Sequence, residues 1–277
     1  MRGEHLHSCL NRKSDDKVIY VGTSGFSYQD WKGHFYPEDI KNSEMLEYYS
    51  RHFNIVEVNY TYYALPSVRT ISSLVRKSDG RVRFSLKAHR DITHSGSIPE
   101  GIFNDYIKGI EPITERGLLD AILVQFPWSF KYKSESLDVL RKIKEGFGEL
   151  PVAVEFRNSS WDSDETANLL RELDLAYCIV DEPDIKGLMP LRLWVTSDFA
   201  YFRFHGRNKE KWYNHREAWE RYDYLYTREE LEEMAYLIRK THEKVPKVLV
   251  FMNNHPLGKA VENARNMVEL LSEEIAR

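Results

Sequence analysis

The chain has 277 residues, of which 42% are hydrophobic and 30% are charged. This composition is ordinary for a globular protein, and the length is sufficient for one large core or for a single α/β barrel. The formal net charge of −4 argues against a protein that coats nucleic acid or anionic membranes through bulk positive charge, and leaves room only for a local basic cleft.

The two cysteines, Cys9 and Cys178, do not indicate a disulfide framework, because the first lies in a polar segment and the second in an apolar run. We therefore expect a cytoplasmic protein. No apolar stretch approaches the roughly 18–20 residues that a membrane-spanning helix needs, so no membrane partner is expected. Residues 1–16 lack the apolar segment of a signal peptide and are predicted to form an irregular extension ahead of one domain, residues 17–277.

Short runs rich in β-branched and aromatic residues recur eight times along the chain and predict eight strands. Each run is nearly continuously apolar in its first half, as expected for parallel strands that are covered by helices. Because amphipathic segments separate most of the runs, the pattern predicts right-handed crossovers that close a single TIM-type (β/α)8 barrel. The expected strands are residues 18–23, 55–60, 82–88, 121–126, 152–157, 176–181, 200–205 and 248–253.

Helix-start residues stand ahead of several amphipathic segments. Each precedes apolar residues at helical spacing, and Thr227 together with Glu230 also matches a capping box. The expected helix starts lie at Ser43, Ser67, Ser134 and Thr227.

Two connections depart from the regular pattern. Residues 184–197 follow Pro183 and contain Pro190, so the helix region after the sixth strand is expected to be short or missing. Residues 206–226, after the seventh strand, form a long insertion rich in Trp and Tyr. This insertion fits either a packed cover over the barrel mouth or a platform that stacks on the rings of a ligand.

The polar residues of the expected strands fall on one face of each strand. Glu57 and Asn59 alternate with Val56 and Val58, and the same period of two recurs in other strands. Because helices cover the apolar face, the polar face must look into the barrel, near the C-terminal strand ends where barrel enzymes carry their active sites. The converging residues are Glu57, Asn59, Lys87, Gln125, Glu155, Arg157, Asp181, Arg203, His205 and Asn253.

This set contains three acids and three bases, so it also fits a purely structural network of ion pairs. Each desolvated charge costs several kcal/mol before pairing, and apolar packing is often as stable. A plug of six charges is a costly way to stabilise a barrel, and we favour a ligand or catalytic site. Whether Glu57 with Lys87, and Glu155 with Arg203, form ion pairs or act as separate catalytic groups stays open at this stage.

Blocks of characteristic sequence keep their order between residues 18 and 270. They include VGTSGFSY at 21–28, YYSRHFN at 48–54, AVEFR at 153–157, YFRFHG at 201–206 and NNH at 253–255. Together these blocks resemble the YecE-like family, known as domain of unknown function 72. The resemblance implies a TIM-type barrel, in agreement with the strand count, and implies no reaction because the family has no settled activity.

Three chemistries compete for this set of residues. A divalent metal would bind carboxylates and histidines, but Lys87, Arg157 and Arg203 would oppose it, so no cofactor is predicted and a metal is kept as an alternative. Glycoside hydrolysis needs two carboxylates about 5–10 Å apart, for which Glu57 and Glu155 on opposite strands are candidates. Recognition of an anion suits the arginine side chains best, because a guanidinium binds carboxylate or phosphate with two hydrogen bonds.

The favoured hypothesis is an enzyme, a hydrolase or a lyase, that acts by acid–base chemistry on a small anionic substrate, phosphorylated or nucleotide-like, at the C-terminal barrel mouth. The predicted catalytic residues are Glu57, Lys87, Glu155, Arg203 and His205. The predicted substrate-binding residues are Asn59, Gln125, Arg157, Asp181, Trp212, Tyr224 and Asn253.

The alternative is a non-catalytic protein that binds nucleic acid or another ligand through the aromatic insertion and the rim cations Lys209 and Lys211. The overall acidic charge counts against the nucleic-acid partner. The sequence predicts no oligomeric state.

Overall fold

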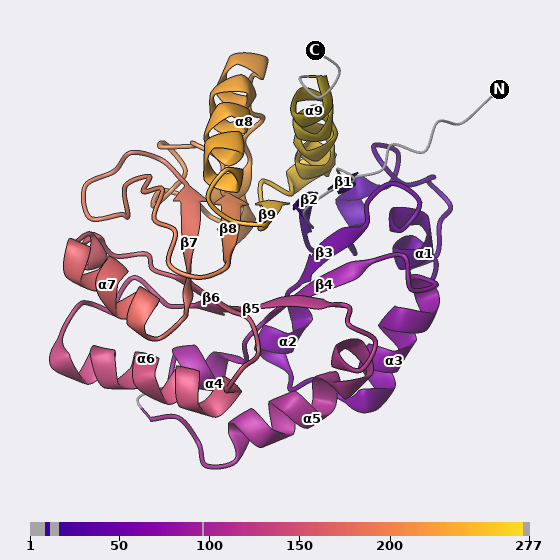
Figure 1. Ribbon diagram of the computed structural model, residues 1–277. Helices are drawn as coiled ribbons and strands as arrows, with labels where there is room; N and C mark the ends of the chain where they lie inside the picture. Colours follow the sequence, from indigo (N-terminus) through magenta and orange to yellow (C-terminus); the bar gives the residue numbers. More distant parts are fainter. Residues whose placement is uncertain (1–8, 12–16, 96, 274–277) are drawn as a thin grey trace.

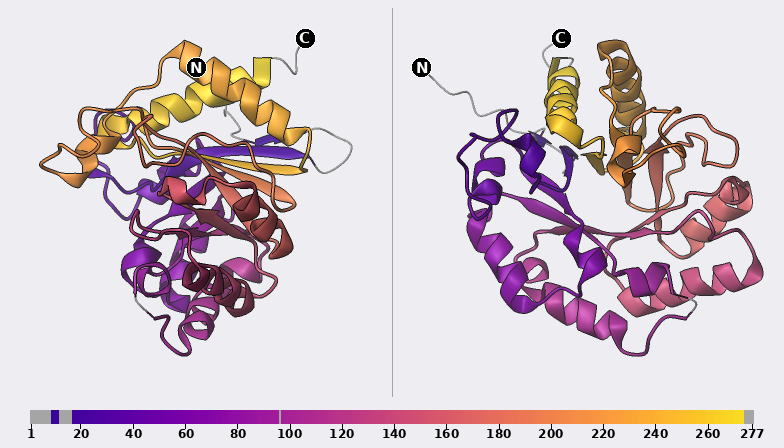
Figure 2. Two further views of the ribbon diagram at one scale, coloured as in Figure 1. Left: turned by 90° about the vertical axis from the view of Figure 1, so that its left-hand side faces the viewer. Right: turned by 180° about the vertical axis from the view of Figure 1, so that it is seen from behind.

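The computed structural model describes residues 9–11, 17–95 and 97–273. Helices surround a central ring of strands, and the sequence runs once around this ring, so that the last helix comes to lie beside the first barrel strand (Figure 1). The view from behind shows the same ring, with α8 and α9 side by side (Figure 2).

Within the described residues, eight parallel strands form a closed barrel. The strands pair in chain order from β2 to β9, and β9 pairs with β2 to close the ring. This confirms the predicted (β/α)8 barrel, and every expected strand overlaps an observed one. The barrel strands are β2 Val18–Ser24, β3 Ile55–Val58, β4 Arg83–Lys87, β5 Leu119–Gln125, β6 Val152–Glu155, β7 Ala176–Asp181, β8 Phe199–Phe204 and β9 Lys247–Met252.

A short additional strand, β1 Cys9–Asn11, pairs antiparallel with the first half of β2. The predicted irregular extension over residues 1–16 is therefore wrong for these three residues, and residues 1–8 and 12–16 lie outside the described part of the chain. β3 is in register only with Thr23 and Ser24 of β2, which leaves the first half of β2 without a β3 partner. β1 satisfies the backbone groups of that edge.

The helices pack their apolar faces on the outside of the barrel. In α3, for example, Ile71, Leu74 and Val75 are buried. The longer helices are α3 Val68–Lys77, α5 Ile102–Thr114, α6 Ser134–Phe147, α7 Asp164–Glu172, α8 Arg228–His242 and α9 Lys259–Glu273. The shorter ones are α1 Met45–Tyr49, α2 Tyr60–Tyr63 and α4 Arg90–Thr93, with 3-10 turns η1 Gln29–Trp31, η2 Ser159–Trp161, η3 Ala218–Tyr222 and η4 Pro256–Gly258. No helix in the described ranges has the length and apolar character that crossing a membrane requires.

Two of the four expected helix starts are capped as predicted. The Ser67 hydroxyl accepts a hydrogen bond from the Thr70 amide at the start of α3, and Thr227 forms a complete capping box with Glu230 at the start of α8. The other two lack a side-chain cap, because Glu44 precedes α1 and Ser134 is already the first residue of α6.

Both irregular connections are present. Residues 182–198, between β7 and β8, contain no α-helix, as the two prolines predicted. Residues 206–226 form the expected insertion after β8, in which η3 is the one helical turn assigned among these described residues. Trp212 and Tyr226 of this segment are buried, at 3% exposure each, whereas Tyr213 and Trp219 are about half exposed or more, at 63% and 48%.

Candidate functional site

Arg203 of β8 binds two glutamates from different strands inside the barrel. Its Nη2 donates to Glu57 Oε1 of β3 at 2.7 Å, and its Nη1 donates to Glu155 Oε2 of β6 at 2.6 Å. All three side chains are at most 3% exposed. The period-two pattern thus placed these residues on the correct face, and the structure makes Glu155 and Arg203 an ion pair. The partner of Glu57 is Arg203 rather than Lys87.

Neutral hydroxyl groups surround the Glu57–Arg203 pair, and one of them, Tyr201, contacts Glu57 itself. The Tyr201 hydroxyl donates to Glu57 Oε2 at 2.7 Å and lies 2.7 Å from Ser85 Oγ. Ser24 Oγ lies 3.5 Å from Arg203 Nη2. The sequence analysis did not select Ser24, Ser85 or Tyr201, although Tyr201 shares the inward parity of Arg203.

A second arginine extends the network toward the end of β7. Arg157 Nε lies 2.5 Å from Glu155 Oε1, and Arg157 Nη1 donates to Glu182 Oε2 at 3.1 Å. The Glu182 side chain is only 1% exposed. Burial raises the pKa of this carboxyl to about 7, against the opposing effect of Arg157. Glu182 was not predicted, because it lies one residue beyond Asp181, past the end of β7, where strand parity no longer applies.

His205 is held by two neighbours. The side-chain amide of Asn253 donates to His205 Nδ1 at 2.8 Å, and His205 Nε2 lies 3.3 Å from Glu155 Oε1. Burial, aided by the nearby positive charge of Arg157, lowers the pKa of His205 to about 3. The imidazole is therefore neutral at pH 7, with its proton on Nε2 facing Glu155, which suits the positioning of Glu155 better than proton abstraction from a ligand.

Lys87 differs from the other cations of the predicted set. Its Nζ donates to Gln125 Oε1 at 2.8 Å and lies 4.6 Å from the centroid of the Tyr62 ring. Among the described residues, no carboxylate lies within salt-bridge distance of this ammonium group. Burial, followed by the positive charge of Arg203, lowers the pKa of Lys87 to about 8.

The remaining predicted ligand-binding residues have other contacts. Asp181 accepts hydrogen bonds from Arg207 Nη2 at 2.6 Å and from the Tyr226 hydroxyl at 2.7 Å. Trp212 packs edge-on against a tyrosine of the insertion, and the Tyr224 hydroxyl donates to Glu230 at 2.7 Å. These contacts fit the packed-cover interpretation of the insertion, so the role of Trp212 and Tyr224 in stacking stays a prediction.

Several buried polar atoms near the mouth have no hydrogen-bond partner among the described residues. Glu155 Oε1, Arg157 Nε and His205 Nε2 still lie in the close ion-pair contacts given above. The others include Asn59 Oδ1, Glu182 Oε1 and Arg203 Nε. Buried polar atoms in proteins are nearly always paired with protein, ligand or water, so these atoms mark where a polar ligand or ordered water would bind. Across residues 9–11, 17–95 and 97–273, no cluster of three or more His, Cys, Asp or Glu side chains is arranged to hold a metal ion.

Comparisons with known proteins agree with the fold and with the sequence blocks. The model of the family described as protein of unknown function DUF72 matches residues 20–277. The UPF0759 protein YunF of Bacillus subtilis is 32% identical over 275 residues, which cover 93% of this chain and 96% of that protein.

Solved structures of the same family are similar in three dimensions. A DUF72 family protein from Thermotoga maritima is 42% identical, with a TM-score of 0.86 over 92% of this chain and 99% of its own. A DUF72 family protein from Enterococcus faecalis is 30% identical, with a TM-score of 0.81 over 92% of this chain and 95% of its own. With its barrel and these matches, the chain belongs to the DUF72 family of proteins of unknown function.

Proposed function

We propose that this protein is an enzyme that acts by acid–base chemistry on a small anionic substrate at the C-terminal mouth of the barrel, with Lys87 as the group that exchanges the proton. The observation that carries the proposal is the state of Lys87. A desolvated ammonium group without a carboxylate partner, with a pKa near 8, loses and regains its proton readily near neutral pH.

The charge balance of the mouth supports an anionic ligand. Three cations (Lys87, Arg157 and Arg203) face the glutamates Glu57 and Glu155, and the carboxyl of Glu182, with its pKa raised to about 7, carries only part of a negative charge at neutral pH. The arginine–glutamate pairs neutralise each other, so the uncompensated positive charge lies at Lys87. An anion bound there would gain a partner without breaking an existing ion pair.

The other predicted catalytic residues receive supporting roles in this proposal. Arg203 holds Glu57 and Glu155 in fixed positions, and His205 orients Glu155 through its Nε2. Gln125 positions the Lys87 ammonium, and Arg157 or Asn59 contacts the ligand. No cofactor is part of the proposed chemistry.

The first test needs no ligand. Burying the Lys87 ammonium group without an ion-pair partner destabilises the folded protein. We therefore expect Lys87→Met to be more stable than the wild type by roughly 1–2 kcal/mol, because functional residues are often retained at the expense of stability. Urea unfolding measures this difference. Lys240→Met, which removes a lysine that is 49% exposed on α8, is the control and should change the stability little. A marked loss of stability in Lys87→Met would indicate a structural role instead.

The second test identifies the ligand class. Chelator-treated protein is screened by thermal shift against inorganic phosphate, nucleoside monophosphates, sugar acids and divalent metal ions. An anion present at about 100 times its Kd should stabilise the protein by about 2.7 kcal/mol. We expect this stabilisation in the wild type and in Lys240→Met, and not in Lys87→Met. An anion that stabilises Lys87→Met equally well would contradict the proposal.

The nucleic-acid alternative has weaker support, because the rim cations already have acidic neighbours. Lys209 Nζ lies 4.0 Å from Asp184 Oδ2, and Lys211 Nζ lies 3.0 Å from Glu220 Oε2. Phosphate contacts would have to compete with these carboxylates.

A further inference from the structure

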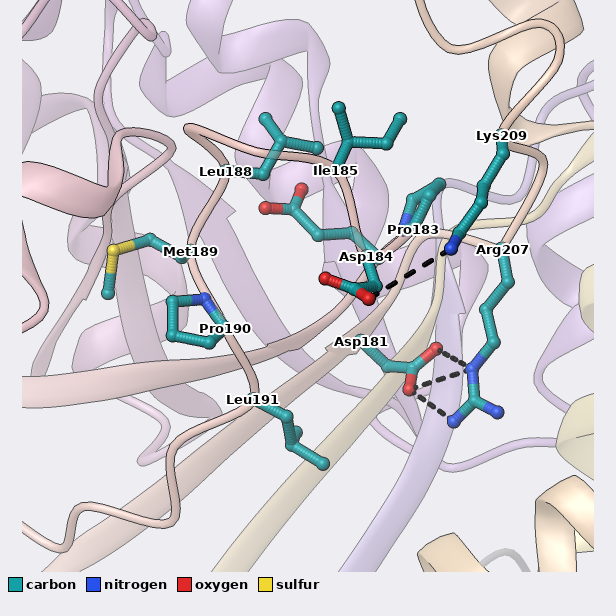
Figure 3. A pocket seen from close by; sticks show the side chains of 11 residues that line it. Asp181, Pro183, Asp184, Ile185, Leu188, Met189, Pro190, Leu191, Arg207 and Lys209 are labelled. Carbon is teal, nitrogen blue, oxygen red and sulfur yellow. Dashed lines mark hydrogen bonds and ion pairs between the residues drawn. The ribbon is translucent and has the colours of Figure 1, made fainter.

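The insertion after β8 is fastened to the barrel at both of its ends. At its start, Arg207 is held by Asp181 of β7, with Nη2 donating to Oδ2 at 2.6 Å, as Figure 3 shows. Near its end, Lys259 Nζ of α9 donates to Asp223 Oδ1 at 2.5 Å. The Asn208 side-chain amide joins the two parts by donating to the backbone carbonyl of Asp223 at 3.0 Å. These contacts fix the insertion at the barrel mouth.

Tyr222, the last residue of η3, carries an aromatic ring to this mouth. Its ring centroid lies 6.0 Å from that of His205, directly after β8, and 5.9 Å from that of His255, which follows β9. Trp212, which is only 3% exposed, packs edge-on against the same ring at 6.2 Å and helps to fix its position. The sequence analysis selected Trp212 and Tyr224 of the insertion as ligand-binding residues, but not Tyr222.

The Tyr222 hydroxyl and Arg157 Nη2 are two donors without a partner. Neither forms a hydrogen bond with a residue that the structure describes, although Arg157 Nε faces Glu155 and its Nη1 donates to Glu182. Neither atom is one of the buried polar atoms that lack a partner, so both are accessible to solvent. In agreement with this, the Arg157 side chain keeps 11% of its surface exposed.

The two donors interact electrostatically. Burial by itself lowers the pKa of Arg157, but Glu155 and then Tyr222 outweigh it and raise this pKa above its usual range. A guanidinium only donates hydrogen bonds, and a free phenol hydroxyl can donate to the same acceptor. A cation would be repelled by Arg157, and an apolar group would leave both donors without a partner. The pair therefore suits an anionic oxygen group.

The glutamates beside Arg157 oppose such an anion only in part. Glu155 also pairs with Arg203, at 2.6 Å, so its charge is shared between two arginines. The pKa of Glu182 is raised to about 7 by burial, which leaves this carboxyl partly uncharged at neutral pH. The charge that remains at Nη2 is therefore able to hold an anion.

We propose that Tyr222 is a substrate-binding residue, and that its hydroxyl and Arg157 Nη2 together bind the phosphate or carboxylate group of the substrate. This inference rests on the proposed function, because it names residues that hold the anion in addition to Lys87. It makes the insertion part of the site as well as its cover.

Tyr222→Phe removes the hydroxyl and keeps the ring that packs against Trp212. Because the hydroxyl has no partner in the described part of the chain, this variant should unfold at the same urea concentration as the wild type. Tyr226→Phe is the contrast within the insertion, because the Tyr226 hydroxyl donates to Asp181 Oδ1 at 2.7 Å and its loss should lower the urea midpoint. An equally lowered midpoint in Tyr222→Phe would mean that its hydroxyl has a structural partner, and would overturn the proposal.

Titration calorimetry with inorganic phosphate and, separately, with acetate measures anion binding and distinguishes a phosphate from a carboxylate. We expect the wild type to bind at least one of the two anions saturably, and Tyr222→Phe to bind it about tenfold more weakly, which corresponds to the loss of one hydrogen bond to a charged group. Tyr213→Phe, at a position of the same insertion that is 63% exposed, is the control and should bind like the wild type. Equal affinities of Tyr222→Phe and the wild type, or no saturable binding of either anion, would overturn the proposal.

Titration of Lys87→Met with the same anion separates this inference from the proposed function. An anion that loses affinity in Tyr222→Phe but not in Lys87→Met would support the role of Tyr222 and contradict that of Lys87. The reverse result would overturn the role of Tyr222 and leave the proposed function in place.

A measurement on the wild type locates the anion even if a variant fails to fold. In spectra of the protein with ¹³C-labelled tyrosine, the anion should shift the ring resonance of Tyr222 and leave that of Tyr213 in place. A saturable shift that omits Tyr222 would place the anion elsewhere and overturn the proposal.

Discussion

Burial favours the uncharged form of three side chains at the barrel mouth. It raises the pKa of an acid and lowers the pKa of a base. The pKa of Glu182 is raised to about 7, that of His205 is lowered to about 3, and that of Lys87 is lowered to about 8. Glu155 is equally buried, yet Arg157 and Arg203 outweigh the burial and hold its pKa well below the usual range. Ion pairing therefore decides which residues stay charged.

These shifts predict an unusual pH dependence of stability. Between about pH 4.5 and 6.5, Glu182 binds a proton in the folded protein that it loses on unfolding, which stabilises the fold as the pH falls. His205 does the opposite, because it is neutral when folded and becomes protonated when unfolded. In this pH range, the contributions of Glu182 and His205 to the pH dependence of the unfolding free energy have opposite signs and cancel. In Glu182→Gln, only the contribution of His205 remains. The unfolding free energy of this variant should therefore fall on acidification by about 1.4 kcal/mol more per pH unit than that of the wild type.

Urea unfolding over a series of pH values measures the two slopes. Glu47→Gln, which removes a carboxylate that is 55% exposed, serves as the control and should follow the wild type. Parallel curves for Glu182→Gln and the wild type would mean that the Glu182 carboxyl is ionised throughout this pH range.

At this scale the sequence revealed part of the candidate site. Glu57, Glu155 and Arg203 could be predicted because the period of two separates the lumen face of a buried strand from the helix face. Glu182 could not, because it lies just past the end of β7, where strand parity no longer applies. The period of two also does not identify which side chains contact each other. The Tyr201–Glu57 hydrogen bond, for example, joins residues that are 144 positions apart in the sequence.

At the scale of elements, parallel strands that are covered on both faces carry the strongest local signal. All eight barrel strands could be predicted, because each is a β-branched or aromatic run bounded by polar segments. β1 could not, since three residues in a polar stretch carry no periodicity. Of the four predicted helix starts, Ser67 and Thr227 cap their helices, and Ser43 and Ser134 do not. A hydroxyl residue alone does not determine a cap, because capping also depends on the direction from which the preceding chain enters the helix.

The close approach of β2 and β3 depends on Gly22. A Cβ atom at this position would lie 2.3 Å from the carbonyl oxygen of Ile55, a backbone atom that cannot move without breaking the strand pairing. We expect Gly22→Ala to destabilise the protein by about 3 kcal/mol, the upper range for overpacking.

The matched control is Gly80→Ala, where nothing lies within 4 Å of the added Cβ and only the positive φ of 65° is unfavourable. This variant should cost about 1 kcal/mol. Urea unfolding compares the two variants, and similar losses would mean that β2 and β3 can separate to admit the methyl group.

At the scale of the whole molecule, buried charges occupy both ends of the barrel. At the N-terminal end of the strands, Asp120 pairs with Arg83 at 2.5 Å and with Lys247 at 3.2 Å. At the C-terminal end, Arg203 connects Glu57 and Glu155 across the lumen. Of these two clusters, only the C-terminal one includes buried polar atoms without a partner in the described part of the chain, which is why the mouth rather than the floor is the candidate site.

The mouth network should behave as one energetic unit. Arg203→Met alone leaves Glu57 and Glu155 buried without their shared cation, and removal of one partner from a buried pair costs about 3–5 kcal/mol. In Glu57→Gln/Arg203→Met, one of the stranded charges is gone. The loss of stability in the double variant should therefore be smaller than the sum of the single losses by about 1–3 kcal/mol.

A double-mutant cycle by urea unfolding measures this coupling, and the exposed pair Glu47 and Arg51 on the outside of the barrel provides the comparison. These side chains are 55% and 51% exposed, so Glu47→Gln and Arg51→Met should couple by no more than about 0.5 kcal/mol. The large coupling at the mouth follows from the exclusion of water. When the guanidinium is removed, no water can take its place as the hydrogen-bond donor to the carboxylates in the lumen. Additive losses in the Glu57–Arg203 cycle would instead mean that water reaches these carboxylates, and that the lumen is open below the level of Lys87.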